Sequence, residues 1–359
     1  MTSDNAVGST AYYHTRRLPR PAGELMPHTA QELCDAVDEL HSAGQLWRVL
    51  GDGQHARRGE SSLDEKWTAI RTDELDSVVE LDRKSGLVCV EAGMRWKALQ
   101  AELLARGFST QRYGLHPSTA TVGGMLARRR PGPPMLRGGE LLDGCVSIGA
   151  HSPTDGEYRY LVAPRKASGP DLRHRFMGAG DADGVIVDAT FVVWRPVAER
   201  LLLFRNRSLA EAAQIMGELF LAEISPSCVH YSHNSGSLQI ILSAPGQLLR
   251  SRIRWITEHI GAPDDTGDAD KASTRRAWLE DRHPDRRSHP EAARTHVYWM
   301  APSALDADPV ELFGNGFDDL EIACWTPRRV EIFARFDESA TPAAPPPGAC
   351  WAHWPQLED

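Results

Sequence analysis

Three glycine-rich loops, each beside a short apolar run, restrict the folds open to this chain. Residues 46–50 (LWRVL) lead into GDGQHARRG at 51–59, which has three glycines in nine residues. Gly123 and Gly124 lie in HPSTATVGGMLA, and GAGDADG at 178–184 leads into VIVDATFVVW. Short β-branched runs indicate strands, and glycine allows sharp turns and close backbone approach. The pattern predicts strands that end in loops whose amides face an anion.

Helices alternate with these strands, so both classes of element contribute to the core. Thr29 with Glu32 forms a capping-box pattern, the apolar residues that follow share one helical face, and Gly44 ends the helix. The segment 77–93 reads as two strands around a turn at 84–86, and 95–107 reads as an amphipathic helix closed by Gly107. From about Val197 a helix, a strand and a second helix indicate a smaller α+β domain.

Composition excludes several functional classes. The chain has 359 residues and a net charge of −9, so a basic nucleic-acid-binding surface is not expected. Its six cysteines are scattered without a CxxC pair, which argues against a metal ribbon or a disulfide framework. No segment has the length and apolarity of a membrane span or signal peptide, so we expect a cytoplasmic protein, which a membrane-attached partner could still hold at a surface.

The order of the segments is more specific than any single loop. Strand, glycine loop at 51–59, VEAGMRWKALQAELLARG, PSTATVGGMLA, GPPMLRGGELLDG and GPDLRHRFMGAGDADGVIVDAT follow one another along the chain. This order resembles the FAD-binding domain of the vanillyl-alcohol oxidase superfamily, also called the PCMH type. Within that superfamily the chain is most similar to the short FAD-binding subunit of bacterial glycolate oxidase.

The resemblance implies an α+β fold in which a PCMH-type two-subdomain FAD-binding domain at 24–196 follows an N-terminal extension at 1–23. A smaller α+β cap or substrate domain would occupy 197–335, and 336–359 would form a Pro/Ala-rich tail. FAD would be bound non-covalently, because His55 lies one place later than the attached histidine of the covalent variants. The implied cofactor-binding residues are Gly51, Asp52, Gly53, Gln54, His55, Thr121, Gly123, Gly124, Gly178, Gly184 and Ile186.

The chain departs from the family pattern at charged positions. Asp181 and Asp183 replace a glycine and an aliphatic residue in the last loop. A carboxylate about 6 Å from a phosphate charge costs on the order of 3 kcal/mol at an effective dielectric of about 20. Arginines at 128–130 or Arg137 could compensate this charge, or the aspartates could be turn residues that point into solvent. Arg165 and Lys166 replace a Lys-Asn pair, and the family's C-terminal motif is missing.

Two functions follow from these observations. The first is an FAD-dependent oxidoreductase component that takes hydride from a 2-hydroxy acid-like small-molecule substrate and passes electrons to a partner subunit. The second is a non-catalytic scaffold or accessory subunit that keeps the fold and has lost FAD. No catalytic base and no metal ligand is assigned. His230 and His233, in CVHYSHNSG, are candidates for acid–base work by position alone.

Overall fold

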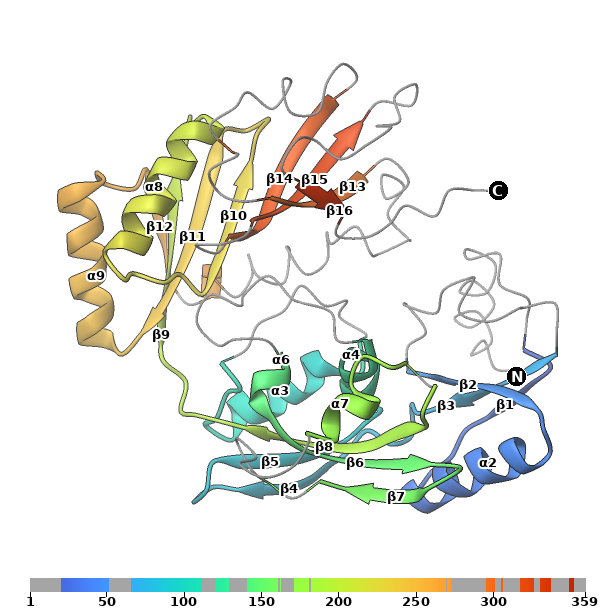
Figure 1. Ribbon diagram of the computed structural model, residues 1–359. Coiled ribbons are helices and arrows are strands. Elements are labelled where there is room, and N and C mark those ends of the chain that lie inside the picture. The colour runs from blue at the N-terminus through green and yellow to red at the C-terminus, as the bar shows by residue number, and fades with distance from the viewer. Residues whose placement is uncertain are drawn as a thin grey trace, which may run out of the picture. The chain divides into compact units, whose positions relative to one another are not determined.

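The computed structural model describes residues 21–51, 66–111, 120–128, 141–160, 162, 171–180, 182–268, 270–272, 295–300, 305, 317–325, 330–336 and 349–351. The chain divides into two compact units (Figure 1). The first contains the described residues through Arg195, and the second contains those from Pro196 onward. The cap or substrate role expected for the second part stays a prediction. No helix among the described residues is long and apolar enough to cross a membrane.

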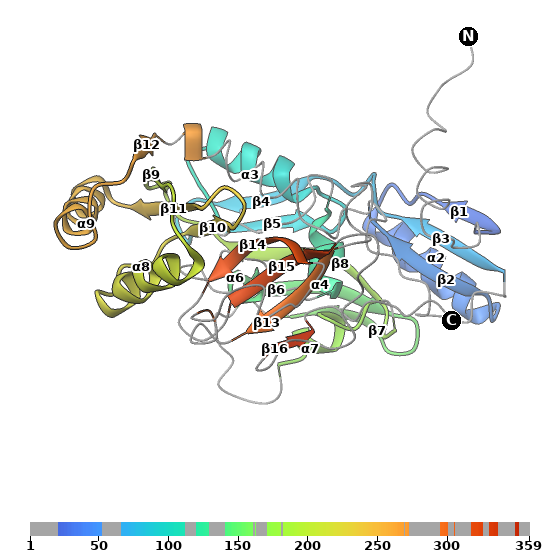
Figure 2. The same ribbon diagram turned by 90° about the horizontal axis from the view of Figure 1, so that it is seen from above.

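The first unit begins with a small parallel sheet. Strand β1 (Gly23–Leu25), β2 (Leu46–Leu50) and β3 (Trp67–Arg71) lie in the order β1-β3-β2. Figure 2 shows them side by side with α2 (Ala30–Ser42) against them. Strand β2 is less buried than its apolar sequence predicts, because only Leu50 is fully covered.

The cap of α2 follows half of the predicted pattern. The Thr29 hydroxyl accepts the Glu32 backbone N–H at 3.1 Å, as a capping box requires. The Glu32 carboxylate, however, accepts the N–H of His28 at 2.8 Å, one residue before the N-cap. At the other end Gly44, with a φ of 64°, follows the last helical turn as the sequence predicts.

An antiparallel sheet of five strands forms the rest of the first unit. Its order is β4-β5-β8-β6-β7, and helices cover one of its faces (Figure 1). The strands are β4 (Val78–Asp82), β5 (Leu87–Glu91), β6 (Cys145–Ser152), β7 (Gly156–Arg159) and β8 (Val185–Val192). The helices are α3 (Trp96–Ala105), α4 (Val122–Arg128), α6 (Leu141–Gly144) and α7 (Arg173–Phe176).

Two cores hold the first unit together. One lies between the five-stranded sheet and its helices, and Leu99 of α3 and Phe191 of β8 are completely buried in it. The other joins α2 to β3 and to the start of β8, where Leu33, Ile70 and Val185 pack together. Apolar burial therefore fixes the small sheet against the large one.

The second unit is an eight-stranded antiparallel sheet with two long helices, α8 (Leu209–Leu221) and α9 (Gly246–His259). The strand order is β12-β9-β11-β10-β14-β15-β13-β16. The strands are β9 (Ala198–Phe204), β10 (Cys228–Ser232), β11 (Ser237–Ala244), β12 (Asp265–Gly267), β13 (Thr295–Met300), β14 (Phe317–Trp325), β15 (Val330–Phe336) and β16 (Ala349–Trp351).

One part of the expected tail is in this sheet. Residues 349–351 lie in the segment expected to form a separate tail, but they pair with β13 as its edge strand. Backbone N–H and C=O groups at a sheet edge pair with an added strand whatever its side chains are. The boundary expected at residue 335 therefore lies too early, because it was based on the Pro/Ala-rich composition of the segment that follows.

Candidate functional site

The first and second glycine-rich segments meet at one point of the first unit. Gly51 follows β2, and a Cβ atom placed on it would lie 2.1 Å from the Thr121 Oγ1 atom. Thr121 is itself buried, and its hydroxyl accepts the N–H of Gly124 at 3.2 Å in the first turn of α4. The tertiary structure thus brings Gly51, Thr121 and Gly124 together.

Gly123 brings the start of α4 against the end of β5. Its N–H donates to the Ala92 carbonyl at 2.7 Å, and an added Cβ would lie 2.8 Å from the Ala92 Cβ. Gly93, which the sequence analysis did not select, is tighter still: an added Cβ would lie 1.6 Å from the Thr72 carbonyl oxygen. The "EAG" after β5 was the available signal, because glycine after a strand often marks a close backbone approach.

The third glycine-rich loop meets the other end of α4. Gly178 donates its N–H to the Leu126 carbonyl at 3.1 Å, and Gly180 donates to the Ala127 carbonyl at 3.0 Å. These bonds satisfy carbonyl groups that a helix end leaves without an intrahelical partner. Helix α4, which contains Gly123 and Gly124 in its first turn, is therefore bonded at its other end to the third glycine-rich loop.

Gly184 and Ile186 begin the central strand β8. Gly184 has a φ of 137°, and an added Cβ would lie 2.1 Å from the His151 carbonyl oxygen, so only glycine fits there. Ile186 pairs with Ala150 of β6, and its side chain is buried in the core. The Ile186 side chain therefore packs in the core and is not available to a ligand, and the predicted contact through its backbone stays a prediction.

The described glycines differ in what occupies the space beside them. At Gly51, Gly123 and Gly184 other protein atoms occupy the place of a side chain, so packing within the chain requires glycine. Beside Gly180 an added Cβ would meet nothing within 4 Å, and beside Gly124 it would meet only the Thr121 hydroxyl. Gly180 therefore leaves room for the close approach of an extended cofactor, whereas the space beside Gly124 is limited by the Thr121 hydroxyl.

The charge of Asp183 is paired within the same part of the chain. Its Oδ2 atom lies 4.0 Å from Nε of Arg175, which belongs to the short helix α7. The Arg175 Nη2 atom also donates to Asp155 at 2.6 Å, which lowers the pKa of Asp155 and raises that of Arg175. Asp183 is therefore not an isolated anion, and the sequence analysis missed the cation that pairs with it.

Several predicted positions lie outside the described residues. Among the cofactor-binding candidates these are Asp52, Gly53, Gln54 and His55, and the altered positions Arg129, Arg130, Arg137, Arg165, Lys166 and Asp181 lie there too. The Arg128 backbone ends α4, but its side chain is not described. Their roles stay predictions.

A histidine–carboxylate pair connects the five-stranded sheet of the first unit to helix α2. His151 Nε2 lies 2.8 Å from Oδ1 of Asp38 on α2, which is 113 residues away in the chain. His151 is buried, and its Nδ1 atom has no hydrogen-bond partner among the described residues, whereas Asp38 is half-exposed. The same surroundings raise the pKa of the neighbouring Cys34 thiol to about 11, chiefly through burial, which makes that thiol unreactive.

The two candidate histidines of the second unit occupy different settings. His230 is buried in β10 opposite Gln239, and His233 lies in the turn after that strand. Tyr231, between them, points into the apolar core and donates its hydroxyl to the Arg207 carbonyl at 3.1 Å. No group of three or more His, Cys, Asp or Glu residues in the described part of the chain could hold a metal ion.

Comparison with known families supports the cofactor class. Residues 21–160 match the family described as FAD binding domain. The chain is 24% identical over 211 residues to alkyldihydroxyacetonephosphate synthase of Dictyostelium discoideum, which covers 57% of this chain and 34% of that protein. It is 23% identical over 234 residues to the uncharacterized FAD-linked oxidoreductase YgcU of Escherichia coli K12, which covers 64% of this chain and 48% of YgcU. The chain thus spans less than half of these relatives.

Solved structures give the same architecture. An alkyldihydroxyacetonephosphate synthase structure aligns with a TM-score of 0.71 at 17% identity, over 88% of this chain and 68% of that one. A berberine bridge enzyme structure aligns with a TM-score of 0.66 at 14% identity, over 94% and 78%. These alignments, with the family match, show that the predicted α+β fold of the PCMH FAD-binding type is correct.

Proposed function

We propose that this chain, which carries an FAD-binding domain of the PCMH type and is related to FAD-linked oxidoreductases, is itself an FAD-dependent oxidoreductase component. The observation that carries the proposal is the convergence of its glycine-rich loops. Gly51 contacts Thr121 at one end of α4, and the 178–180 loop bonds to the other end. These are the segments whose order the resemblance to the family rests on.

The residues present fit FAD in shape and in charge. Gly180 leaves open space beside its backbone, and Arg175 pairs with the acidic replacement at Asp183. Thr121, Gly124, Gly178 and the backbone of Ile186 would hold the cofactor, together with the residues of the 51–59 loop. When bound, FAD would supply the hydride-accepting chemistry, and the chain would supply orientation and electrostatics.

The narrower proposal is a 2-hydroxy acid-like substrate and electron transfer to a partner subunit. It rests on the resemblance of the segment order to the FAD-binding subunit of glycolate oxidase. No proton acceptor is assigned, and His230 and His233 stay candidates for acid–base work by position alone. Partner and substrate are parts of the proposal that activity measurements test.

A second candidate is a scaffold or accessory subunit that keeps the fold without FAD. One observation favours it: packing within the chain requires Gly51, Gly123 and Gly184. These glycines would remain after the cofactor was lost, so their presence alone does not argue for FAD.

An absorbance spectrum separates the two candidates. The purified chain is incubated with excess FAD and desalted, and its flavin content is read from 300 to 600 nm. We expect retained flavin in near-stoichiometric amount, and bleaching of its bands when a 2-hydroxy acid is added without oxygen. A colourless protein after reconstitution would contradict the oxidoreductase proposal and support the scaffold. Retained flavin that no 2-hydroxy acid reduces would contradict only the substrate.

A further inference from the structure

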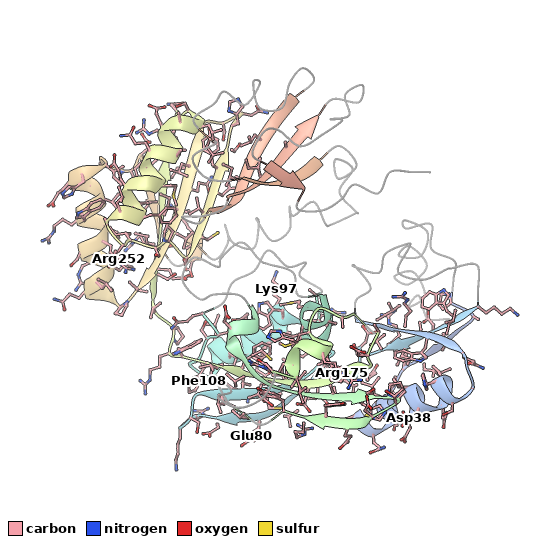
Figure 3. All side chains as sticks on the ribbon, in the orientation of Figure 1. Asp38, Glu80, Lys97, Phe108, Arg175 and Arg252 are labelled. Atoms are coloured by element: carbon pink, nitrogen blue, oxygen red, sulfur yellow. The ribbon has the colours of Figure 1, made fainter. Side chains whose placement is uncertain are left out.

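The side chain of Arg175, labelled in Figure 3, contacts three segments of the first unit. One amino group of its guanidinium donates to Asp155 in the β6–β7 turn, and the other donates to the Tyr158 hydroxyl on β7. Its Nε atom faces Asp183, in the loop that leads into β8. The planar fork of arginine suits such a set of oxygen partners.

Aromatic packing fixes the position of this guanidinium. Its central carbon lies 5.1 Å from the ring centre of Tyr158 and 5.8 Å from that of Phe176. The two rings meet edge to face at 5.1 Å, and Phe176 is buried in the core. The guanidinium therefore rests on a surface anchored in the interior and does not move freely in solvent.

The positive charge of Arg175 has a second effect, on the two carboxylates beside it. Asp183 and Asp155 are both about half-exposed, and Arg175 is the cation beside both of them. Without it, the loop 178–184 would present Asp183 as an unpaired anion next to Gly178 and Gly180. Such a charge repels the phosphates of a dinucleotide across several ångströms.

We propose that Arg175 is a positioning residue that holds the 178–184 loop on the β6–β7 hairpin and offsets part of the negative charge of Asp183, so that the loop accepts the dianionic FAD. This inference rests on the proposed function. It also explains how a loop with an acidic replacement keeps its affinity for a phosphate-bearing ligand. The compensating charge comes from α7, inside the same loop region.

The test is a double-mutant cycle on FAD affinity, measured by quenching of flavin fluorescence at low and high salt. The variants are Arg175→Met, which keeps an apolar stem, Arg175→Lys, Asp183→Asn and the double variant. We expect Arg175→Met to weaken binding about three- to fivefold at low salt, less at high salt, and less when Asp183→Asn is present. Arg254→Met, which removes an exposed arginine of α9, is the control for net charge and is expected to change affinity by less than about twofold.

Two outcomes would overturn the inference. One is an Arg175→Met affinity equal to that of the unmodified chain, and the other is a loss that Asp183→Asn does not reduce. If the unmodified chain binds no FAD, the proposed function fails and hydrogen exchange decides the positioning role by itself. Faster exchange of the Gly178 and Gly180 amides in Arg175→Met than in Arg254→Met then supports the positioning role, and equal exchange overturns it.

Discussion

At the scale of single residues, the contacts of the first unit are explained by small glycines and by paired charges rather than by catalytic groups. Gly51 makes room for the Thr121 side chain, and Gly184 makes room for the His151 carbonyl. These contacts explain the glycine pattern without reference to a ligand, because added methyl groups would overlap neighbouring atoms. A paired charge and a glycine also meet elsewhere in the first unit. Arg159 pairs through both amino groups with Asp188, whose carboxylate occupies the space beside Gly149.

A cycle of Gly51→Ala and Thr121→Ala measures the first contact. Gly51→Ala is expected to lower the free energy of unfolding by about 1–3 kcal/mol, because its methyl group meets the Thr121 side chain. In the Thr121→Ala background the same change should cost less, with a coupling of about 0.5–3 kcal/mol from urea unfolding.

Gly217→Ala is the matched control for this cycle. Gly217 lies within α8, and an added Cβ there meets nothing within 4 Å. Because alanine is the better helix former, we expect this variant to gain about 0.5–1 kcal/mol. Equal costs of Gly51→Ala with and without Thr121 would show that the contact does not limit this position.

At the scale of elements, caps and turns define where helices and strands begin. Helix α8 starts with a complete capping box: the Ser208 hydroxyl accepts the Glu211 N–H at 3.2 Å, and the Glu211 carboxylate accepts the Ser208 N–H at 2.8 Å. In the β4–β5 turn the Asp82 carboxylate likewise accepts the N–H groups of Lys84 and Ser85. Such local bonds form from residues close in sequence, so both elements were predictable.

The Glu211 cap makes stability depend on pH. Hydrogen bonds from the Ser208 backbone and hydroxyl lower the pKa of Glu211 below its ordinary value. A carboxylate with a lowered folded-state pKa adds stability above its unfolded-state pKa, and this is lost as pH falls through the folded value. We expect the unmodified chain to be more stable than Glu211→Gln at pH 7, and the difference to shrink as pH falls below the ordinary pKa of a glutamate, about 4.3.

Urea midpoints of the two proteins across this pH range provide the measurement. Glu258→Gln, which removes an exposed carboxylate of α9 outside the cap, serves as the control. A stability difference between the unmodified chain and Glu211→Gln that stays constant with pH would contradict the assigned role of the carboxylate.

At the scale of the whole molecule, the chain has separate apolar cores in its two units. Leu99 lies in the core of α3 and the five-stranded sheet, and Leu219 lies in the core of α8 and the eight-stranded sheet. The residues predicted to bind FAD all belong to the first unit. Binding of FAD, or a mutation in one core, should therefore change the stability of one unit more than that of the other.

Leu99→Ala and Leu219→Ala test this separation. Each truncation should cost its own unit about 2–5 kcal/mol, because both side chains are completely buried. Hydrogen exchange is expected to rise in α3 and β8 for Leu99→Ala, and in α8 and β11 for Leu219→Ala. Added FAD should slow exchange in the first unit more than in the second. Equal acceleration of both units by either variant would instead indicate one cooperative unit.

The amino-acid sequence by itself determined the local elements and the class of the fold. Helices are defined by signals within a few residues of them: apolar periodicity, the caps at Ser208 and Thr29, and the glycines that end helices. The order of the segments indicated a PCMH-type domain. Only the tertiary structure decided which residues meet: Gly51 with Thr121, His151 with Asp38, β16 with β13, and Arg175 with Asp183. Such contacts depend on how sheets pack and on which rotamers packing permits, and neither is encoded in the spacing of residues along the chain.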